Sequence, residues 1–217
     1  MRDLVALGIL SMLLSACGAI PDRRSGQAQR PTTSAGIGVF DPSPSARQCF
    51  SDLGKANVRF SPLPNRQFTG GCSQIDSIKL LDVGADVTNL GPVKCELAGR
   101  FAAWTEYAVK RAARQYLGSD LQRIETMGSY SCRSIAGSGK LSQHAHANAI
   151  DVSAFVLTDG RRITVENHWK SGRSEMQFLA AIHDSACKRF GTVLSPNYND
   201  AHRDHFHLDM SGNGYCR

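Results

Sequence analysis

The chain has 217 residues, of which 41% are hydrophobic, and a net charge of +6. Its length suits one domain with a real hydrophobic core, and we find no internal repeats. The positive charge fits attraction to an anionic polymer or to lipid head groups. We do not expect a nucleic-acid partner, because the basic residues form no stripe interleaved with aromatic residues.

The N-terminus carries the features of a targeting segment. Leu4 to Leu14 is an apolar run with the length of a signal-peptide core, too short to span a bilayer. It ends in Leu14-Ser15-Ala16-Cys17, which resembles a bacterial lipobox and predicts cleavage before Cys17 and acylation of that residue. Two or more acyl chains give stable anchoring. Gly18 follows the cysteine and favours the outer membrane over the inner one. The alternative is an ordinary signal peptide with a chance cysteine.

Three segments follow from this interpretation. Residues 1–17 form a lipoprotein signal peptide, and residues 18–45 form a flexible tether rich in Pro, Ser, Thr, Gly and Ala. Residues 46–217 form the folded domain.

Six cysteines remain after Cys17: Cys49, Cys72, Cys95, Cys132, Cys187 and Cys216. An even number in an exported chain indicates three disulfides in an oxidising compartment. We predict that Cys49 pairs with Cys72, Cys95 with Cys132, and Cys187 with Cys216. Thiolate ligation of zinc is the alternative, but the sequence contains no CxxC pair.

Two helices are predicted from apolar residues at spacings of three and four. The first opens at Gly91-Pro92 and closes at Gly118, with an apolar stripe that includes Trp104. The second starts at Ser174 as a capping box with Gln177, and Gly191 stops it. Both stripes are interpreted as core.

Four strands are predicted around these helices. Residues 149–157 form a strand, residues 158–160 a turn, and residues 161–165 the returning strand. Residues 192–194 and 205–210 form two further strands. The fold class is therefore α+β, with a small, mostly antiparallel sheet and helices packed on one side.

Five of the seven histidines lie in two short segments. The first is Ser142-Gln143-His144-Ala145-His146-Ala147-Asn148-Ala149-Ile150-Asp151, and the second is His202-Arg203-Asp204-His205-Phe206-His207-Leu208-Asp209. Together they offer two imidazoles and one carboxylate as metal ligands. Three protein ligands with water in the fourth position are typical of a hydrolytic Zn²⁺ site.

Strand alternation predicts how these side chains point. His205, His207 and Asp209 share one face of the last strand, and the apolar residues between them share the core face. The same alternation turns Asp151 away from the core. His144 lies in the loop that feeds this strand and can fold back to the same ion. The alternative is a pair of surface histidines without a metal.

These segments resemble known families. The pattern SxHxxxxAxD followed by HxH is similar to zinc peptidases that cut D-amino-acid bonds in peptidoglycan, namely D-Ala-D-Ala carboxypeptidases and dipeptidases and penicillin-insensitive murein endopeptidases. Roughly residues 47–217 resemble the bacterial extensin-like C-terminal family. The resemblance rests on four motifs: Tyr130-Ser131-Cys132-Arg133, the segment from Ser142 to Asp151, Ala186-Cys187-Lys188-Arg189-Phe190, and the run from Asn199 to Asp209. One departure is Ala147, where the peptidases usually carry Gly.

The resemblance implies that His144, Asp151 and His207 are zinc ligands and that His205 is the general base. Dipeptidase-type relatives instead use an acid at the position of Asp204. Alternation favours His205, because Asp204 points to the opposite face if the strand already runs there. If the strand begins only at His205, Asp204 could still turn in.

The resemblance also suggests residues that contact the substrate. His202 matches a histidine that orients the base or binds substrate, and Arg133 matches an arginine that binds or polarises substrate, with a surface arginine as the alternative. His146 has no family role and is predicted to be an exposed neighbour. Ser142 is predicted to cap or orient the loop of His144. Asp209 is predicted to hydrogen-bond a ligand imidazole or to form a salt bridge.

The predicted function is that of a zinc-dependent hydrolase of peptidoglycan peptide bonds, either a carboxypeptidase or an endopeptidase. Its partners are peptidoglycan and, through the lipid anchor, the periplasmic face of the outer membrane. The resemblance implies the fold shared by hedgehog signalling domains and DD-peptidases. The alternatives are a non-catalytic, zinc-containing cell-wall-binding lipoprotein and a structural envelope protein with adventitious metal. A candidate base beside three ligands favours the enzyme.

Overall fold

The computed structural model describes residues 39–217. The predicted signal peptide, the lipidation site Cys17 and most of the predicted tether lie outside these residues. Residues 39–43 lead into the domain, where Val39 pairs with Asn65 and the Ser43 hydroxyl accepts a hydrogen bond from the backbone N–H of Ala46. Within residues 39–217, no helix combines the length and apolarity needed to cross a bilayer.

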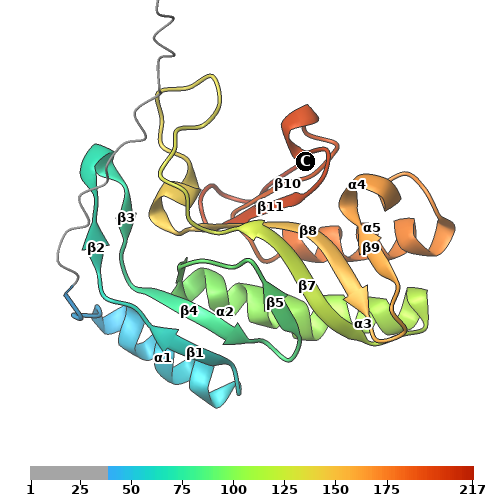
Figure 1. Cartoon of the computed structure of the whole chain (residues 1–217), viewed down its shortest axis with the longest axis horizontal. Helices are drawn as coiled ribbons and strands as arrows, with labels where there is room; N and C mark the ends of the chain where they lie inside the picture. The colour runs from blue at the N-terminus through green and yellow to red at the C-terminus, as the bar shows by residue number, and fades with distance from the viewer. Residues whose placement is uncertain (1–38) are drawn as a thin grey trace, which may run out of the picture. The chain divides into compact units, whose positions relative to one another are not determined.

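The predicted α+β class is confirmed, and Figure 1 shows its arrangement. The largest sheet has the strand order β12-β10-β11-β8-β7-β5, with β9 paired to β8. Its strands are β5 (Asp86–Thr88), β7 (Leu121–Gly128), β8 (Ala149–Leu157), β9 (Arg162–Thr164), β10 (Thr192–Leu194), β11 (Phe206–Asp209) and β12 (Tyr215–Cys216). The pairs β5–β7 and β10–β12 are parallel and the other pairs are antiparallel.

Two smaller sheets come from the N-terminal half, where the sequence patterns predicted no strands. They are β1-β4-β6 and β2-β3. Their bounds are β1 (Arg59–Pro62), β2 (Arg66–Gln67), β3 (Ser73–Gln74), β4 (Ser77–Asp82) and β6 (Val93–Lys94). The helix α1 (Pro44–Lys55) precedes them. Several of these strands have only two residues, which is too short for alternation to be visible in a sequence.

The first predicted helix is a continuous helical run of four elements. These are α2 (Cys95–Trp104), η2 (Thr105–Val109), α3 (Lys110–Ala112) and η3 (Ala113–Leu117). The run begins four residues after Gly91, because β6 occupies the start of the predicted helix. It ends at Gly118, whose φ of 66° lies in the left-handed region that glycine tolerates best.

The second predicted helix is α5 (Arg173–Cys187), which follows the short α4 (Val165–His168). The predicted capping box is wrong, because Gly172 occupies the N-cap position and Ser174 lies inside the first turn. The helix stops before Gly191. That glycine is required for a close approach, since a Cβ atom there would overlap the carbonyl group of Ser211.

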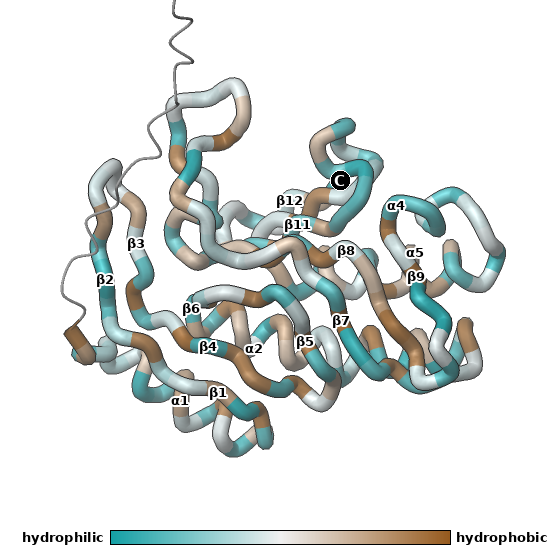
Figure 2. The backbone as a smooth tube through the Cα atoms, in the orientation of Figure 1, coloured by the Kyte–Doolittle hydropathy of each residue, from teal (hydrophilic) through white to brown (hydrophobic). Residues whose placement is uncertain are grey.

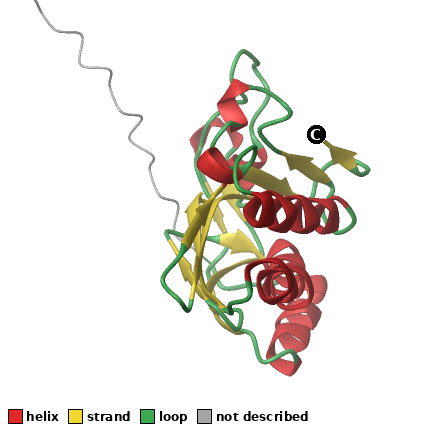
Figure 3. Cartoon of the chain, turned by 90° about the vertical axis from the view of Figure 1, so that its right-hand side faces the viewer, coloured by secondary structure: helices red, strands yellow, loops and turns green. Residues whose placement is uncertain are grey.

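The long helices pack against one side of the strands, as Figure 3 shows. Trp104 is fully buried, and its indole N–H donates to the carbonyl of Ile182 in α5 at 2.9 Å. Its ring contacts Phe155 of β8 edge-on, with centroids 6.1 Å apart. Figure 2 shows hydrophobic stretches along β4 and β8, which contribute to this core. Both predicted apolar stripes are therefore core.

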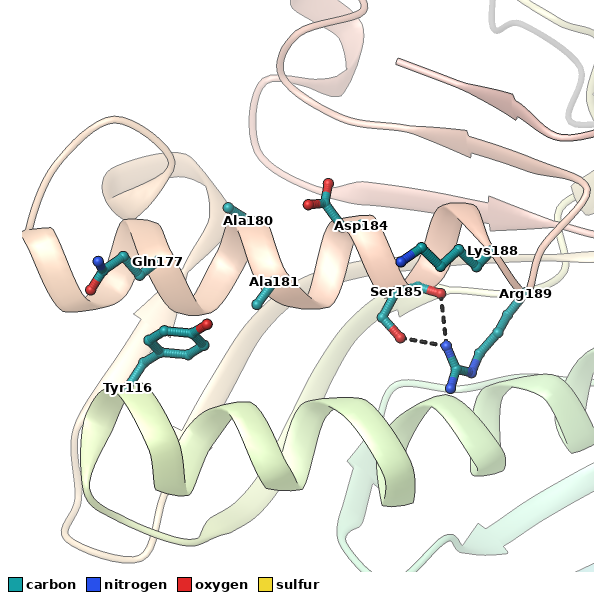
Figure 4. Close-up of a pocket in the computed structure, with 8 residues that line it drawn as sticks. All are labelled: Tyr116, Gln177, Ala180, Ala181, Asp184, Ser185, Lys188 and Arg189. Atoms are coloured by element: carbon teal, nitrogen blue, oxygen red, sulfur yellow. Dashed lines mark hydrogen bonds between the residues drawn. The ribbon is translucent and has the colours of Figure 1, made fainter.

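A surface hollow lies between η3 and α5 (Figure 4). Tyr116 lines it from η3, and the other lining residues come from α5 and the turn that follows. Arg189 is already engaged there, because its guanidinium donates to the hydroxyl and the carbonyl of Ser185. Polar and apolar side chains both line the hollow.

Three disulfides are present, as predicted, but two of the predicted pairings are wrong. Cys49 bonds Cys95 and Cys72 bonds Cys132, whereas the predicted Cys187–Cys216 bond is confirmed. The first bond joins α1 to the first residue of α2, and the second joins Cys72, directly before β3, to the segment after β7. The cysteine pairing is therefore determined by how the helices and strands pack, and not by which cysteines are close in the sequence.

The two corrected pairings can be tested directly. Proteolysis without reduction should release peptides linked through Cys49–Cys95 and Cys72–Cys132, identifiable by mass spectrometry. Replacing Cys49 and Cys95 together by Ala should lower the free energy of unfolding by about 2–4 kcal/mol in urea melts, because the closed loop is lost from the unfolded state. Peptides linked through Cys49–Cys72 would contradict the arrangement.

Candidate metal centre

The register between β8 and β11 brings two predicted ligands together. The strands are antiparallel, and His207 lies directly opposite Asp151. Directly opposite residues have Cβ atoms about 4.5–5.5 Å apart on the same face of the sheet. The neighbouring pair, Phe206 and Val152, points to the other face and is fully buried in the core. The predicted alternation is therefore confirmed in both strands.

The third predicted ligand arrives from the loop before β8. His144 lies in the short helix η4 (Gln143–His146), and Ser142 caps it by accepting a hydrogen bond from the His144 N–H at 3.4 Å. This confirms the role predicted for Ser142. The helix turns directly into β8, so that His144 faces the β8–β11 pair.

Ala147 makes this sharp connection in a strained conformation. It ends η4 with a φ of 51°, in the left-handed region, and it is fully buried. A non-glycine residue there costs about 1–2 kcal/mol. The site loop thus needs a glycine-like backbone at Ala147, the position where the sequence departs from the peptidase pattern.

The three predicted ligands converge on one point. His144 Nε2 lies 3.2 Å from His207 Nδ1 and 3.0 Å from Asp151 Oδ2, and His207 Nδ1 lies 2.9 Å from Asp151 Oδ1. Ligands of a tetrahedral zinc ion with bonds of about 2.0–2.1 Å lie about 3.3 Å apart. The donor spacing therefore fits a small divalent cation, and the three residues form a possible metal-binding group.

Second partners determine which nitrogen of each imidazole faces this point. His144 Nδ1 is 3.1 Å from the carbonyl oxygen of Ser129, which can only accept, so this nitrogen carries the proton. His207 Nε2 is 2.9 Å from the Asp209 carboxylate and donates to it in the same way. In neutral imidazoles, His144 Nε2 and His207 Nδ1 then present lone pairs to the centre, as metal ligation requires. The predicted bond from Asp209 to a ligand imidazole is present.

The electrostatics of Asp151 and His207 favour a positive charge at the candidate centre. Burial raises the pKa of the Asp151 carboxyl, but hydrogen bonds with His144 and His207 outweigh burial and lower that pKa well below its ordinary value. Burial lowers the pKa of His207, but hydrogen bonds to Asp151 and Asp209 raise it to about 9. Positive charge is thus strongly favoured between Asp151 and Asp209.

His205 and Asp204, predicted as alternatives, form a single pair. Because β11 begins at Phe206, Asp204 is free of strand alternation and turns toward the ring of its neighbour. His205 Nδ1 lies 2.8 Å from Asp204 Oδ1, and His205 Nε2 lies 3.7 Å from Asp151 Oδ1. The hydrogen bond to His205 lowers the pKa of Asp204, which keeps the carboxylate ionised. His205 Nε2 is left as a proton acceptor directed toward the candidate centre.

His202 flanks the same group, from the short helix η5 (Asp200–His202). Its ring lies 5.1 Å from that of His205 and 6.0 Å from that of His207, centroid to centroid. Burial and the neighbouring imidazoles lower its pKa to about 4, so it is neutral at neutral pH. Arg133 is exposed. Its positive charge is among the causes that lower the pKa of His202, so Arg133 lies close enough to interact electrostatically with His202.

Two expectations need correction. His146 is half-buried and its Nδ1 is hydrogen-bonded to the Ser73 hydroxyl at 3.1 Å, so it joins η4 to β3 and is not an exposed neighbour. The face predicted to be open is mostly covered, since the side chains of Asp151, His205 and His207 are only 10–12% exposed.

No role was predicted for Ser129, and Asn199 was noted only as the first residue of a family motif. Ser129 contributes through its backbone carbonyl, which any residue possesses, so no residue type could have revealed it. Asn199 accepts from His202 Nδ1 at 2.7 Å. It lies three residues before His202, and the two side chains meet only because the chain turns at η5.

A family model described as Extensin-like protein C-terminus matches residues 47–217. This chain belongs to the extensin-like C-terminal family. Comparison with curated proteins and with solved structures yields no significant match. The matched range of the extensin-like domain contains all three converging candidate ligands and the His205–Asp204 pair.

The hydrogen bond from His207 to Asp209 predicts an effect on metal affinity. Asp209→Asn should lower zinc affinity about 10- to 100-fold, because the ligand loses the carboxylate that orients its ring and raises its basicity. Competition with a chromophoric chelator measures this. Asp200→Asn, an exposed acid outside the group, is the matched control and should bind zinc like the wild type. Equal affinities for both variants would contradict the role of Asp209.

The raised pKa of His207 predicts a pH effect on stability. In protein stripped of metal, protonated His207 stabilises the fold fully below its unfolded pKa of about 6.5, and this stabilisation is lost as pH rises through about 9. The free energy of unfolding should therefore fall across that window, and zinc affinity should rise because zinc and the proton compete. Urea melts of wild type and His207→Gln measure the difference. An identical pH dependence in both would contradict it.

Proposed function

We propose that this extensin-like domain is a zinc-dependent hydrolase of peptide bonds in peptidoglycan. The observation that carries the proposal is the convergence of His144, Asp151 and His207 beside a fourth group, His205, that is oriented for proton transfer. A structural zinc site closes its fourth position with a protein ligand, whereas a catalytic one keeps it open beside a base. The resemblance to zinc DD-peptidases and murein endopeptidases suggests the substrate class and is part of the proposal.

The donor set suits zinc better than the other common cations. Two imidazole nitrogens and one carboxylate oxygen form a His₂Asp set, whereas Mg²⁺ and Ca²⁺ prefer oxygen ligands alone. Both imidazoles are held by second partners, Ser129 and Asp209, in the tautomers that ligation needs. His144, Asp151 and His207 would hold the ion, and Zn²⁺ bound there would polarise a substrate carbonyl and lower the pKa of a water molecule to near 7.

The chain's own residues then divide the proton chemistry. His205 Nε2 accepts the proton of the attacking water and returns it to the leaving amine. Asp204 accepts from His205 Nδ1, so it fixes the ring orientation and stabilises the imidazolium that forms. His202 remains neutral and can hydrogen-bond substrate through Nε2, because Nδ1 is engaged by Asn199. Arg133 supplies positive charge for a substrate carboxylate or the developing oxyanion.

The proposal extends to location. Acylation of Cys17 would hold the enzyme at the periplasmic face of the outer membrane, with a tether that lets the domain reach the cell wall. The net charge of +6 favours approach to an anionic polymer. Peptidoglycan would be the substrate, and the membrane a partner only through the lipid.

Digestion of purified sacculi by the zinc-loaded full chain tests this function. New muropeptides should appear by mass spectrometry and identify the bond, and a chelator should abolish them. His205→Gln should lower turnover about 10²- to 10⁴-fold with zinc content unchanged, since it removes the proton acceptor and leaves the ligands.

His146→Gln is the matched control, because it changes a histidine of the same motif that bonds Ser73 and not the candidate centre. It should retain turnover. His207→Ala should lose both zinc and turnover. Unchanged muropeptides with zinc and with other divalent metals would contradict the hydrolase and favour a wall-binding role.

A further inference from the structure

A row of aromatic rings leads from the candidate metal centre to the surface. The ring of His202 lies 6.0 Å from that of His207, and the ring of Tyr198 lies 5.4 Å from that of His202. Tyr215 continues the row, 6.1 Å from Tyr198. The last two rings are well exposed, at 43% for Tyr198 and 45% for Tyr215. The proposed hydrolytic chemistry uses neither tyrosine.

The row is held by hydrogen bonds of the loop between β10 and β11. The fully buried Ser195 donates its hydroxyl to the carbonyl of Arg217 at 2.8 Å, and its own carbonyl accepts from the Tyr198 N–H at 2.9 Å. On the other side, the indole of Trp169 donates to Asn197 Oδ1 at 3.0 Å. The tyrosines therefore need little further ordering to bind a ligand, which favours affinity.

A positive charge lies at the exposed end of the aromatic row. The guanidinium of Arg217 lies over the Tyr215 ring, 5.5 Å from its centroid. Such a contact holds the ring and places a donor beside it. A surface of flat rings flanked by hydroxyl groups and a guanidinium suits a ligand with flat C–H faces, hydroxyls and carbonyl oxygens. Pyranose rings of amino sugars have these features, whereas a short aliphatic peptide offers no flat face.

We propose that Tyr198 and Tyr215 form a subsite for the amino-sugar rings of the glycan strand, next to the metal centre. This inference rests on the proposed function and adds the sugar to its substrate. Peptidoglycan stems are short peptides attached to such sugars, and an extended chain spans about 3.3–3.6 Å per residue. Three or four residues reach about 10–14 Å. The ring steps of 6.0 Å and 5.4 Å from His207 through His202 to Tyr198 lie within that reach, so a stem of three or four residues is long enough to join the sugar to the bond at the centre.

Binding of two separate probes to the full chain tests the subsite. The first probe is a glycan oligosaccharide stripped of its stem peptides, and the second is the sugar-free stem peptide. The double variant Tyr198→Leu and Tyr215→Leu should weaken binding of the oligosaccharide about tenfold or more, measured by calorimetry. The stem peptide should bind the double variant as it binds the wild type, which also shows that the variant is folded.

Tyr107→Leu is the matched control. Tyr107 is another exposed tyrosine, at 59%, with the guanidinium of Arg111 5.7 Å from its centroid, but it lies in η2 outside the row. It should leave oligosaccharide affinity unchanged. The subsite is overturned if wild type does not bind the oligosaccharide, if the double variant binds it equally well, or if only the stem peptide is affected.

The two proposals fail in different ways. Oligosaccharide binding requires no turnover, so tyrosine-dependent binding without muropeptide release supports the subsite and counts against the hydrolase. Zinc-dependent cleavage without tyrosine-dependent sugar binding overturns the subsite alone.

Discussion

The candidate centre depends on one pairing, the antiparallel register of β8 with β11 that sets His207 opposite Asp151. A shift of one residue would turn every side chain of β11 to the other face, sending the His207 imidazole into the core. Phe206 and Leu208 oppose that shift, because both are fully buried on the core face. The same apolar packing that stabilises the sheet therefore holds the ligands in register.

Around this pair, some backbone and side-chain arrangements lower the local stability of the domain but position the candidate ligands. Ala147 adopts a left-handed conformation so that His144 can face the sheet, and Asp151 is buried without a cationic residue of fixed charge beside it. Ser129 and Asp209 hold the two imidazoles in the tautomers that leave lone pairs pointing inward. In the absence of a metal, a proton on His207 lies between the carboxylates of Asp151 and Asp209 and stabilises this arrangement, and a divalent cation bound there would replace that proton.

The disulfides support the elements that flank the centre. Cys72–Cys132 ties the residue directly before β3 to the segment between Ser129 and the loop that contains His144, and Cys187–Cys216 ties α5 to β12. β12 pairs with β10, which in turn pairs with the strand that holds His207. Covalent bonds thus restrain the segments on both sides of the site, which suits a small domain whose ligands come from distant parts of the chain.

Local patterns in the sequence were sufficient for β8 and β10, for the core stripes of the two long helices, and for the faces of His207 and Asp151. Those features follow from periodicity, which each segment carries by itself. Contacts between distant segments were decided only by the tertiary structure: the partners of Cys49 and Cys72, the carbonyl that orients His144, and the bond of His146 to Ser73. The pairing of His205 with Asp204 belongs with them, because it depends on where β11 begins. That start is determined by pairing with β8, a partner more than fifty residues away in the chain.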